Sequence, residues 1–122
     1  LQSEADMILV GNAVSIPDWD PEQAEKLVHN VTKVPTGNWD EAMKEIILLT
    51  LATKAEEQGE WSAQTAMKIL DGASPAEIPI VTNHIAKPYL NMKLAKRLGI
   101  RFPFDLVETA TLISAETKSD QE

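Results

Sequence analysis

Residues 69–103 read ILDGASPAEIPIVTNHIAKPYLNMKLAKRLGIRFP, and this stretch decides the fold of the chain. Gly72 follows an apolar helix face and suits the left-handed conformation that often ends a helix. Ser74 begins a capping-box pattern with proline at the first helical position and Glu77 at the third. Pro79 lacks a backbone donor and favours an extended residue before it, so we predict a connecting strand over residues 78–82.

The second half of this stretch predicts a strand that passes directly into a helix. Tyr89 and Leu90 are strand-forming residues, and the side chain of Asn91 is suited to cap a helix over residues 92–98. Gly99 then provides the helix end. We therefore expect a strand, a cap and a helix without an intervening loop.

Upstream, the chain alternates predicted strands and helices, which indicates an α/β fold with a mostly parallel sheet and flanking helices. Asp20 begins a second capping box, and the helix that follows has one apolar stripe, made of Ala24, Leu27, Val28 and Val31. The predicted strands cover residues 7–10, 34–36 and 46–51. The last of these also fits a helix that continues from Asp40, after a turn that Asn38 caps.

Two further helices complete the prediction. The helix over residues 56–70 is expected to bury a face of mostly small side chains, namely Gly59, Ala63, Ala66, Met67 and Leu70. The last helix is expected to place Leu106, Val107, Ala110 and Ile113 on one side. Residues 114–122 are polar and are expected to form a disordered tail.

These motifs together resemble the C-terminal signature of the ABC transporter substrate-binding protein family, which has a type I periplasmic-binding fold. In that family a helix ends in L-x-G-x-x-P-x-[DE]-[IL]-P-[IV], a strand enters N-[LM]-K-x-A-x-x-[LI]-G-[IL], and a proline follows. The matching residues here are Leu70, Gly72, Pro75, Glu77, Ile78, Pro79, Ile80, residues 91–100 and Pro103. The resemblance spans most of the chain and implies a Rossmann-like lobe; some family members bind aromatic amino acids.

The resemblance also implies that the chain is an incomplete fragment, since family members are longer and have two lobes. Residues 1–113 would be the C-terminal portion, and residues 54–82 would cross to the other lobe. The apolar face of the helix over residues 56–70 would then lack its partner. We therefore expect the fragment to pair with a second copy as a homodimer, or to dock this helix on its own sheet.

Composition excludes several classes of function. The chain has 19 acidic and 11 basic residues and a formal net charge of -8, which disfavours binding to nucleic acid. It contains no cysteine, so disulfides, thiolate metal sites and cysteine nucleophiles are excluded. No catalytic elbow, phosphate-binding glycine loop or zinc-ligand spacing is present. We accordingly expect no cofactor, no metal and no enzymatic activity.

Candidate binding residues lie in loops that follow the predicted strands, where open parallel sheets bind their ligands. The resemblance implies that the matching loops face an interlobe cleft, which makes Asn12, Thr36, Asn38, Trp39 and Glu57 the candidates. Each has a structural alternative. The asparagines also stabilise turns, Trp39 also suits core packing, and Glu57 is favoured in a first helical turn by the helix dipole.

The function implied by the resemblance is that of a solute-binding component of an ABC importer. It would bind a small polar organic solute such as an amino acid and present it to an ABC permease. Its location would be periplasmic or extracellular, with a lipid anchor in a missing N-terminal segment as one means of attachment. The alternatives are an extracellular ligand-sensing domain of a signalling receptor and an α/β enzyme of unknown chemistry.

Overall fold

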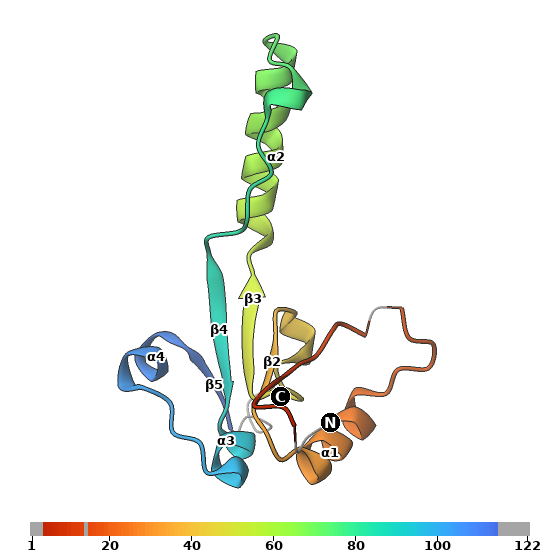
Figure 1. The fold of residues 1–122 in the computed structure, drawn as a ribbon, viewed down its shortest axis with the longest axis vertical. Helices are drawn as coiled ribbons and strands as arrows, with labels where there is room; N and C mark the ends of the chain where they lie inside the picture. The colour runs from red at the N-terminus through yellow and green to blue at the C-terminus, as the bar shows by residue number, and fades with distance from the viewer. Residues whose placement is uncertain (1–3, 14, 115–122) are drawn as a thin grey trace, which may run out of the picture. The chain divides into compact units, whose positions relative to one another are not determined.

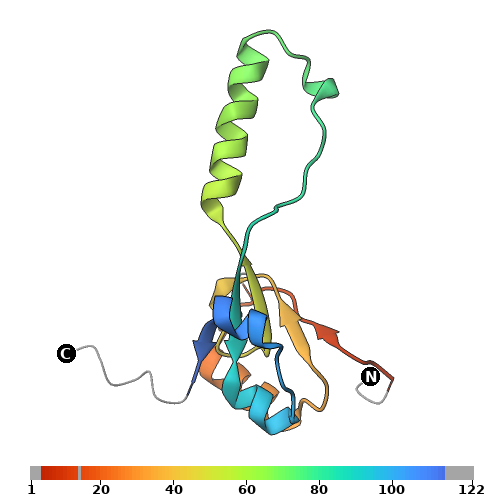
Figure 2. The same ribbon diagram turned by 90° about the vertical axis from the view of Figure 1, so that its left-hand side faces the viewer.

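The structure is a computed structural model that describes residues 4–13 and 15–114. The chain divides into two compact units. Unit 1 contains the described residues up to Ala52 and those from Lys87 onward, and unit 2 is Thr53–Ala86. Figures 1 and 2 show both units from two directions.

Five strands form one sheet in the order β1-β2-β3-β4-β5. They are β1 (Ile8–Leu9), β2 (Thr36–Asn38), β3 (Leu49–Thr53), β4 (Ala86–Asn91) and β5 (Thr111–Ile113). The pairs β1–β2, β2–β3 and β4–β5 are parallel. Figure 1 shows β3 leading toward the long helix α2 and β4 returning from it, so these two neighbours run in opposite directions. The predicted α/β class with a mostly parallel sheet is confirmed.

Helices connect these strands. The α-helices among the described residues are α1 (Pro21–Val31), α2 (Ala55–Leu70), α3 (Met92–Leu98) and α4 (Phe104–Thr109). Two short 3-10 helices are η1 (Glu41–Met43) and η2 (Pro75–Glu77). In unit 2, the chain turns back after α2 and passes through η2, as Figure 2 shows.

Two predicted helix caps are confirmed by their hydrogen bonds. Asp20 Oδ1 accepts from the backbone N–H groups of Glu22 and Gln23, at 2.9 and 3.1 Å, and Gln23 Nε2 donates to Asp20 Oδ2 at 2.7 Å. Asn91 Oδ1 accepts from a backbone N–H in the first turn of α3 at 3.0 Å. Gly99 ends α3 with φ 67°, a conformation that costs glycine little.

The core of unit 1 consists of three clusters of buried side chains. One contains Met43, Ile46 and Ile47, a second contains Leu48, Leu94 and Ala95, and a third contains Ala52, Tyr89 and Ile113. Val28 of α1 packs against both the first and the second cluster. The helix α1 therefore joins two parts of the core, although Leu27 and Val31 of its predicted stripe are 62% and 49% exposed.

The strand predicted over residues 46–51 is placed too early, and the competing continuous helix is also wrong. Ile46 and Ile47 both donate their backbone N–H groups to Met43 O at 3.0 Å, so their hydrogen bonds are local rather than between strands. The strand begins at Leu49. The apolar run reflects burial in a turn that precedes the strand, and burial alone does not identify strand pairing.

The other predicted strand bounds also shift. The strand expected over residues 7–10 is limited to Ile8–Leu9, and the one expected over residues 34–36 is Thr36–Asn38. Asn38 is consequently the last strand residue instead of a helix cap. The cap of η1 is Asp40, whose Oδ1 accepts from Ala42 N at 3.0 Å.

The expected buried face of the helix over residues 56–70 is wrong for this structure. No residue of α2 is buried, and Met67 and Leu70 are 59% and 79% exposed. The same holds for every residue of unit 2, none of which is buried. The small-residue face of α2 therefore has no packing partner among the described residues.

The turn after α2 differs from its prediction in two respects. The helical turn η2 forms, but the side chain of Ser74 makes no capping hydrogen bond. Residues 78–82 are not a strand, although Ile78 has the extended backbone that Pro79 favours. We call residues 78–85 the return segment, because they lead from η2 back to β4.

The last predicted helix is too long. The helix α4 ends at Thr109, and Ala110 is extended with φ -89° and ψ 155°. The residues that follow form β5, which pairs with β4 through Tyr89↔Thr111 and Asn91↔Ile113. Ile113 is therefore buried in the sheet and does not lie on a helix face. Residues 115–122 of the predicted polar tail lie outside the described residues.

Candidate functional site

The loops after β1 and β2 lie side by side because these strands are parallel and adjacent. Their register pairs Ile8 with Thr36 and Leu9 with Gly37, and Val10 N donates to Gly37 O at 2.9 Å beyond the end of β1. Parallel strands present their carboxyl ends at one edge of a sheet. This edge therefore carries Val10, the residues that follow it, and the end of β2.

Asn38 joins the two loops. Its Nδ2 donates to Val10 O at 2.5 Å and to Gly11 O at 3.2 Å, and its Oδ1 accepts from Asp40 N. The side chain is 5% exposed. Both ends of the amide are thus occupied by backbone groups, and Asn38 fixes the shape of this edge.

Thr36 lies at the other end of β2 from Asn38. It is buried, and its hydroxyl accepts from Leu48 N at 3.0 Å. This bond ties the start of β2 to the segment that leads into β3. The structure therefore gives Thr36 a position in the interior, away from the loop that follows the strand.

Asn12 and Trp39 are the two predicted site residues at this edge that face solvent. Trp39 directly follows β2 and is 49% exposed, and Asn12 lies in the exposed loop after β1. A half-exposed indole offers a flat apolar surface, and an exposed amide offers both a donor and an acceptor. The edge held by Asn38 thus presents one stacking group and one hydrogen-bonding group.

A polar cluster that the sequence did not predict is built around Glu41, two residues after Trp39 in the chain. Tyr89 donates its hydroxyl to Glu41 Oε1 at 2.5 Å, and Lys44 Nζ lies 3.2 Å from the same oxygen. Lys44 Nζ and Lys87 Nζ lie 5.1 and 4.9 Å from the centre of the Tyr89 ring. These residues are distant in the sequence, so no local signal identifies the cluster.

The charges of this cluster stabilise one another. The hydrogen bond from Tyr89 is the main cause of a lowered pKa of Glu41, and the bond and ion pair with Lys44 add to it. The pKa of Lys87 is raised, chiefly by its interaction with Tyr89. Glu41 therefore stays ionised and Lys87 stays protonated at neutral pH.

Glu57, the last predicted site residue, belongs to unit 2. Its Oε1 accepts from His84 N at 2.7 Å and its Oε2 accepts from Ile85 N at 3.0 Å. These two backbone donors, His84 first, lower the pKa of Glu57 below its ordinary value of 4.5. Each carboxylate oxygen thus already has one partner within its own unit.

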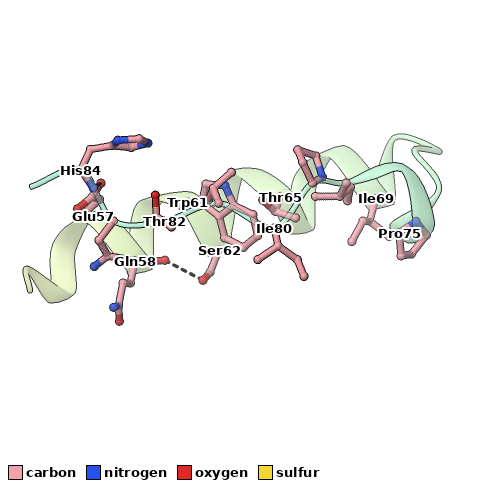
Figure 3. Close-up of a pocket in the computed structure, with 14 residues that line it drawn as sticks. Glu57, Gln58, Trp61, Ser62, Thr65, Ile69, Pro75, Ile80, Thr82 and His84 are labelled. Carbon is pink, nitrogen blue, oxygen red and sulfur yellow. Dashed lines mark hydrogen bonds between the residues drawn. The ribbon is translucent and has the colours of Figure 1, made fainter. Parts of the chain in front are cut away.

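Unit 2 contains a pocket of about 660 Å³, lined by α2, Pro75 and residues 78–84. Figure 3 shows Glu57 and His84 together at one end of it, and Ile69 and Pro75 at the other. Among the described residues, no group of histidine, aspartate or glutamate side chains is placed to hold a metal ion. The described helices include none with the length and apolar character that crossing a membrane requires.

Comparison with known families supports the resemblance. The model of the family described as ABC transporter substrate binding protein matches residues 22–113, which is most of the chain. The chain belongs to this family. No curated protein matches the chain.

Several solved structures are similar to it. The ABC domain from Streptococcus pneumonia in complex with L-Trp is 25% identical with a TM-score of 0.56, covering 92% of this chain and 38% of that chain. A conserved domain protein from Vibrio cholerae O1 biovar El Tor is 18% identical with a TM-score of 0.57, covering 93% and 38%. The ligand-free, open structure of a substrate binding protein with adhesive properties from Clostridium difficile is 19% identical with a TM-score of 0.59, covering 93% and 37%.

The two structures with lower identity support the fold alone. This member of the ABC transporter substrate-binding family spans less than two fifths of the length of the three solved chains, since it covers 38%, 38% and 37% of them.

Proposed function

We propose that this chain is the C-terminal portion of a non-enzymatic solute receptor that supplies an ABC permease with a small polar organic solute such as an amino acid. The observation that carries this proposal is the family match over residues 22–113, which includes Asn38 and Trp39 and begins after Asn12. The similarity to a chain in complex with L-Trp supports an amino acid as the solute. A receptor of this kind works in the periplasm or outside the cell.

Within this proposal, Trp39 and Asn12 contact the solute. Trp39 stacks on its apolar part, and Asn12 forms a hydrogen bond with a polar group. Asn38 belongs to the site through its position, because its bonds to Val10 O and Gly11 O hold the loop that carries Asn12. Thr36 supports β2 from the interior, and the carboxylate of Glu57 binds His84 N and Ile85 N within unit 2.

We also propose that residues 54–82 pack against a second lobe that this chain does not contain. Two observations support this. No residue of unit 2 is buried, although Trp61, Met67 and Ile80 are exposed to 41%, 59% and 101%. The similar solved chains are also much longer than this one. A surface this apolar is ordinarily covered in a folded protein.

The second lobe is tested by the accessibility of Trp61. In a variant with Trp19→Phe and Trp39→Phe, Trp61 is the sole tryptophan of this chain, which has three. We expect acrylamide to quench its fluorescence less in the whole protein than in this chain alone, provided that the remainder carries no tryptophan. Equal quenching in both would contradict the packing proposal.

The solute role is tested by titration calorimetry of the whole protein with L-tryptophan, a neutral aliphatic amino acid, a dicarboxylate and a sugar. We expect an amino acid to bind, and Trp39→Ala to weaken that binding by about tenfold or more. Trp19→Ala is the control. Trp19 is also a partly exposed tryptophan, at 38%, but it lies next to Asp20, the N-cap of α1, and does not follow a strand. Binding of none of the amino acids would refute the proposed solute class, and an unchanged affinity in Trp39→Ala would refute the site.

A further inference from the structure

The carboxylate of Glu57 bridges two parts of unit 2 that are far apart in the sequence. Glu57 lies in the first turn of α2, and its two oxygens accept from consecutive backbone donors, His84 N at 2.7 Å and Ile85 N at 3.0 Å. Hydrogen bonds to an ionised carboxylate are stronger than bonds between neutral groups. Glu57 therefore closes a loop that contains nearly all of α2, η2 and the return segment.

Little else holds the return segment to α2. The segment has no regular secondary structure, and none of its residues is buried. Among the described residues, the bonds to Glu57 are the only hydrogen bonds between α2 and residues 78–85. The return segment and α2 otherwise meet as two walls of the pocket that both line. Glu57 thus provides the specific polar constraint on this segment.

The position of this bridge is informative because both of its ends lie near the boundary of unit 2. Unit 2 begins at Thr53 and ends at Ala86, so Glu57 follows the first connection and Ile85 precedes the second. The first connection runs through β3 and the second through β4, and these two strands are neighbours in the sheet. The bonds of Glu57 continue this link beyond the strands, from the first turn of α2 to the residues that lead into β4.

We propose that Glu57 is a latch, a positioning residue that fastens the return segment to the start of α2 so that both connections of unit 2 move together. In a receptor that closes around a solute by hinge motion, the latch makes unit 2 turn as one body. That last consequence rests on the proposed function, whereas the latch itself concerns only the contacts of unit 2.

Amide hydrogen exchange in the whole protein, measured without any solute, tests the latch. Glu57→Gln is the more specific of two substitutions, because glutamine keeps the size of the side chain. It has only one acceptor oxygen, and its NH2 group would face one of the two N–H donors. We expect exchange at His84 or Ile85 to accelerate by about tenfold in Glu57→Gln, and at both residues in Glu57→Ala. Unchanged exchange at both positions in both variants would overturn the proposal.

Glu56→Gln is the matched control. Glu56 also lies in the first turn of α2, so its replacement removes the same charge from the helix start. We expect wild-type exchange at His84 and Ile85 in this variant. Acceleration there equal to that in Glu57→Gln would show that helix charge, rather than the latch, protects these amides, and would also overturn the proposal.

A second measurement separates a latch from a general contribution to stability. Backbone order parameters from NMR relaxation should fall over residues 78–85 in Glu57→Ala, while α2 stays helical and the midpoint of thermal unfolding stays close to that of wild type. Equal order in the return segment with and without Glu57 would refute the latch. If the latch holds but the whole protein binds no amino acid, the proposed solute class fails and the latch does not.

Discussion

Asn91 Nδ2 lies 3.4 Å from His29 Nε2 and at the same time donates to Glu45 O at 2.7 Å. Its Oδ1 accepts from Leu94 N at 3.0 Å, and the residue is 0% exposed. One buried amide thus connects α1, the segment before β3 and the start of α3. Since a buried polar group is costly unless it is satisfied, this network specifies how three elements of unit 1 fit together.

Replacing Asn91 should therefore be among the most damaging changes in unit 1. Asn91→Ala removes a helix cap and leaves Glu45 O without this donor, and we expect it to lower the free energy of unfolding by about 2 to 4 kcal/mol. Asn91→Ser keeps an oxygen that can cap α3 but not the amide donor, so it should cost less. Denaturant unfolding of both variants measures this, and equal losses would show that the cap contributes little.

His29 should make the stability of unit 1 sensitive to pH. Burial is the first cause of its lowered pKa, and the nearby Arg97 and Lys93 add to this, while Glu25 opposes it. The unfolded chain therefore takes up a proton more readily than the folded chain. The contribution of His29 to the free energy of unfolding is constant above the ordinary pKa of 6.5. It decreases as the pH falls through that value, and it levels off below the pKa of His29 in the folded chain.

The measurement is denaturant unfolding on both sides of pH 6.5 in the wild type and in His29→Gln. We expect the wild type to lose more stability than the variant on the acidic side, because glutamine does not titrate. An NMR titration of the His29 ring should give a midpoint below 6.5. A midpoint above that value would reverse the sign of the prediction.

The sequence predicted best those features that depend on neighbouring residues. The caps Asp20 and Asn91 and the helix end at Gly99 were foreseeable because each bonds within a few residues of itself. The strand β5 was not, because its pairing with β4 is long-range and its apolar residues also fit a helix face. The pattern at Ile46 and Ile47 predicts a strand for a related reason, since burial in a turn and burial in a sheet select the same apolar side chains.

The sequence indicates in which loops the candidate residues lie, but it does not indicate which groups their side chains bind. The predicted strands placed Asn12, Asn38 and Trp39 in the loops that follow them, and the structure brings the two loops together. It does not follow from the sequence that Asn38 is fully occupied by backbone groups, because Val10 O and Gly11 O are 28 and 27 residues away. For the same reason, the sequence does not indicate that Glu57 accepts hydrogen bonds from His84 N and Ile85 N, which are 27 and 28 residues away.

Asn38 and Trp39 should accordingly respond differently to alanine. Asn38→Ala removes the bonds to Val10 O, Gly11 O and Asp40 N, and we expect it to lower the free energy of unfolding by about 2 to 3 kcal/mol. Trp39→Ala removes a side chain that is 49% exposed, and we expect a loss of less than about 1 kcal/mol. Thermal unfolding of both variants measures this difference, and a larger loss in Trp39→Ala would show that the indole belongs to the core.

Two threonines in neighbouring strands offer a matched test of the buried polar groups. Thr36 and Thr50 are 3% and 0% exposed, but only the first has a partner: its hydroxyl accepts from Leu48 N, whereas no described residue provides a hydrogen bond for Thr50 Oγ1. A buried hydroxyl without a partner costs free energy, and valine has nearly the same shape.

We therefore expect opposite signs from the same substitution. Thr50→Val should raise the free energy of unfolding by about 0.5 to 2 kcal/mol, because it removes an unsatisfied hydroxyl from the core. Thr36→Val should lower it by about 1 to 3 kcal/mol, because it leaves Leu48 N without an acceptor. Denaturant unfolding of the two variants measures both. Destabilisation by Thr50→Val would indicate that the hydroxyl of Thr50 has a partner in solution, and a neutral Thr36→Val would indicate that Leu48 N finds another acceptor.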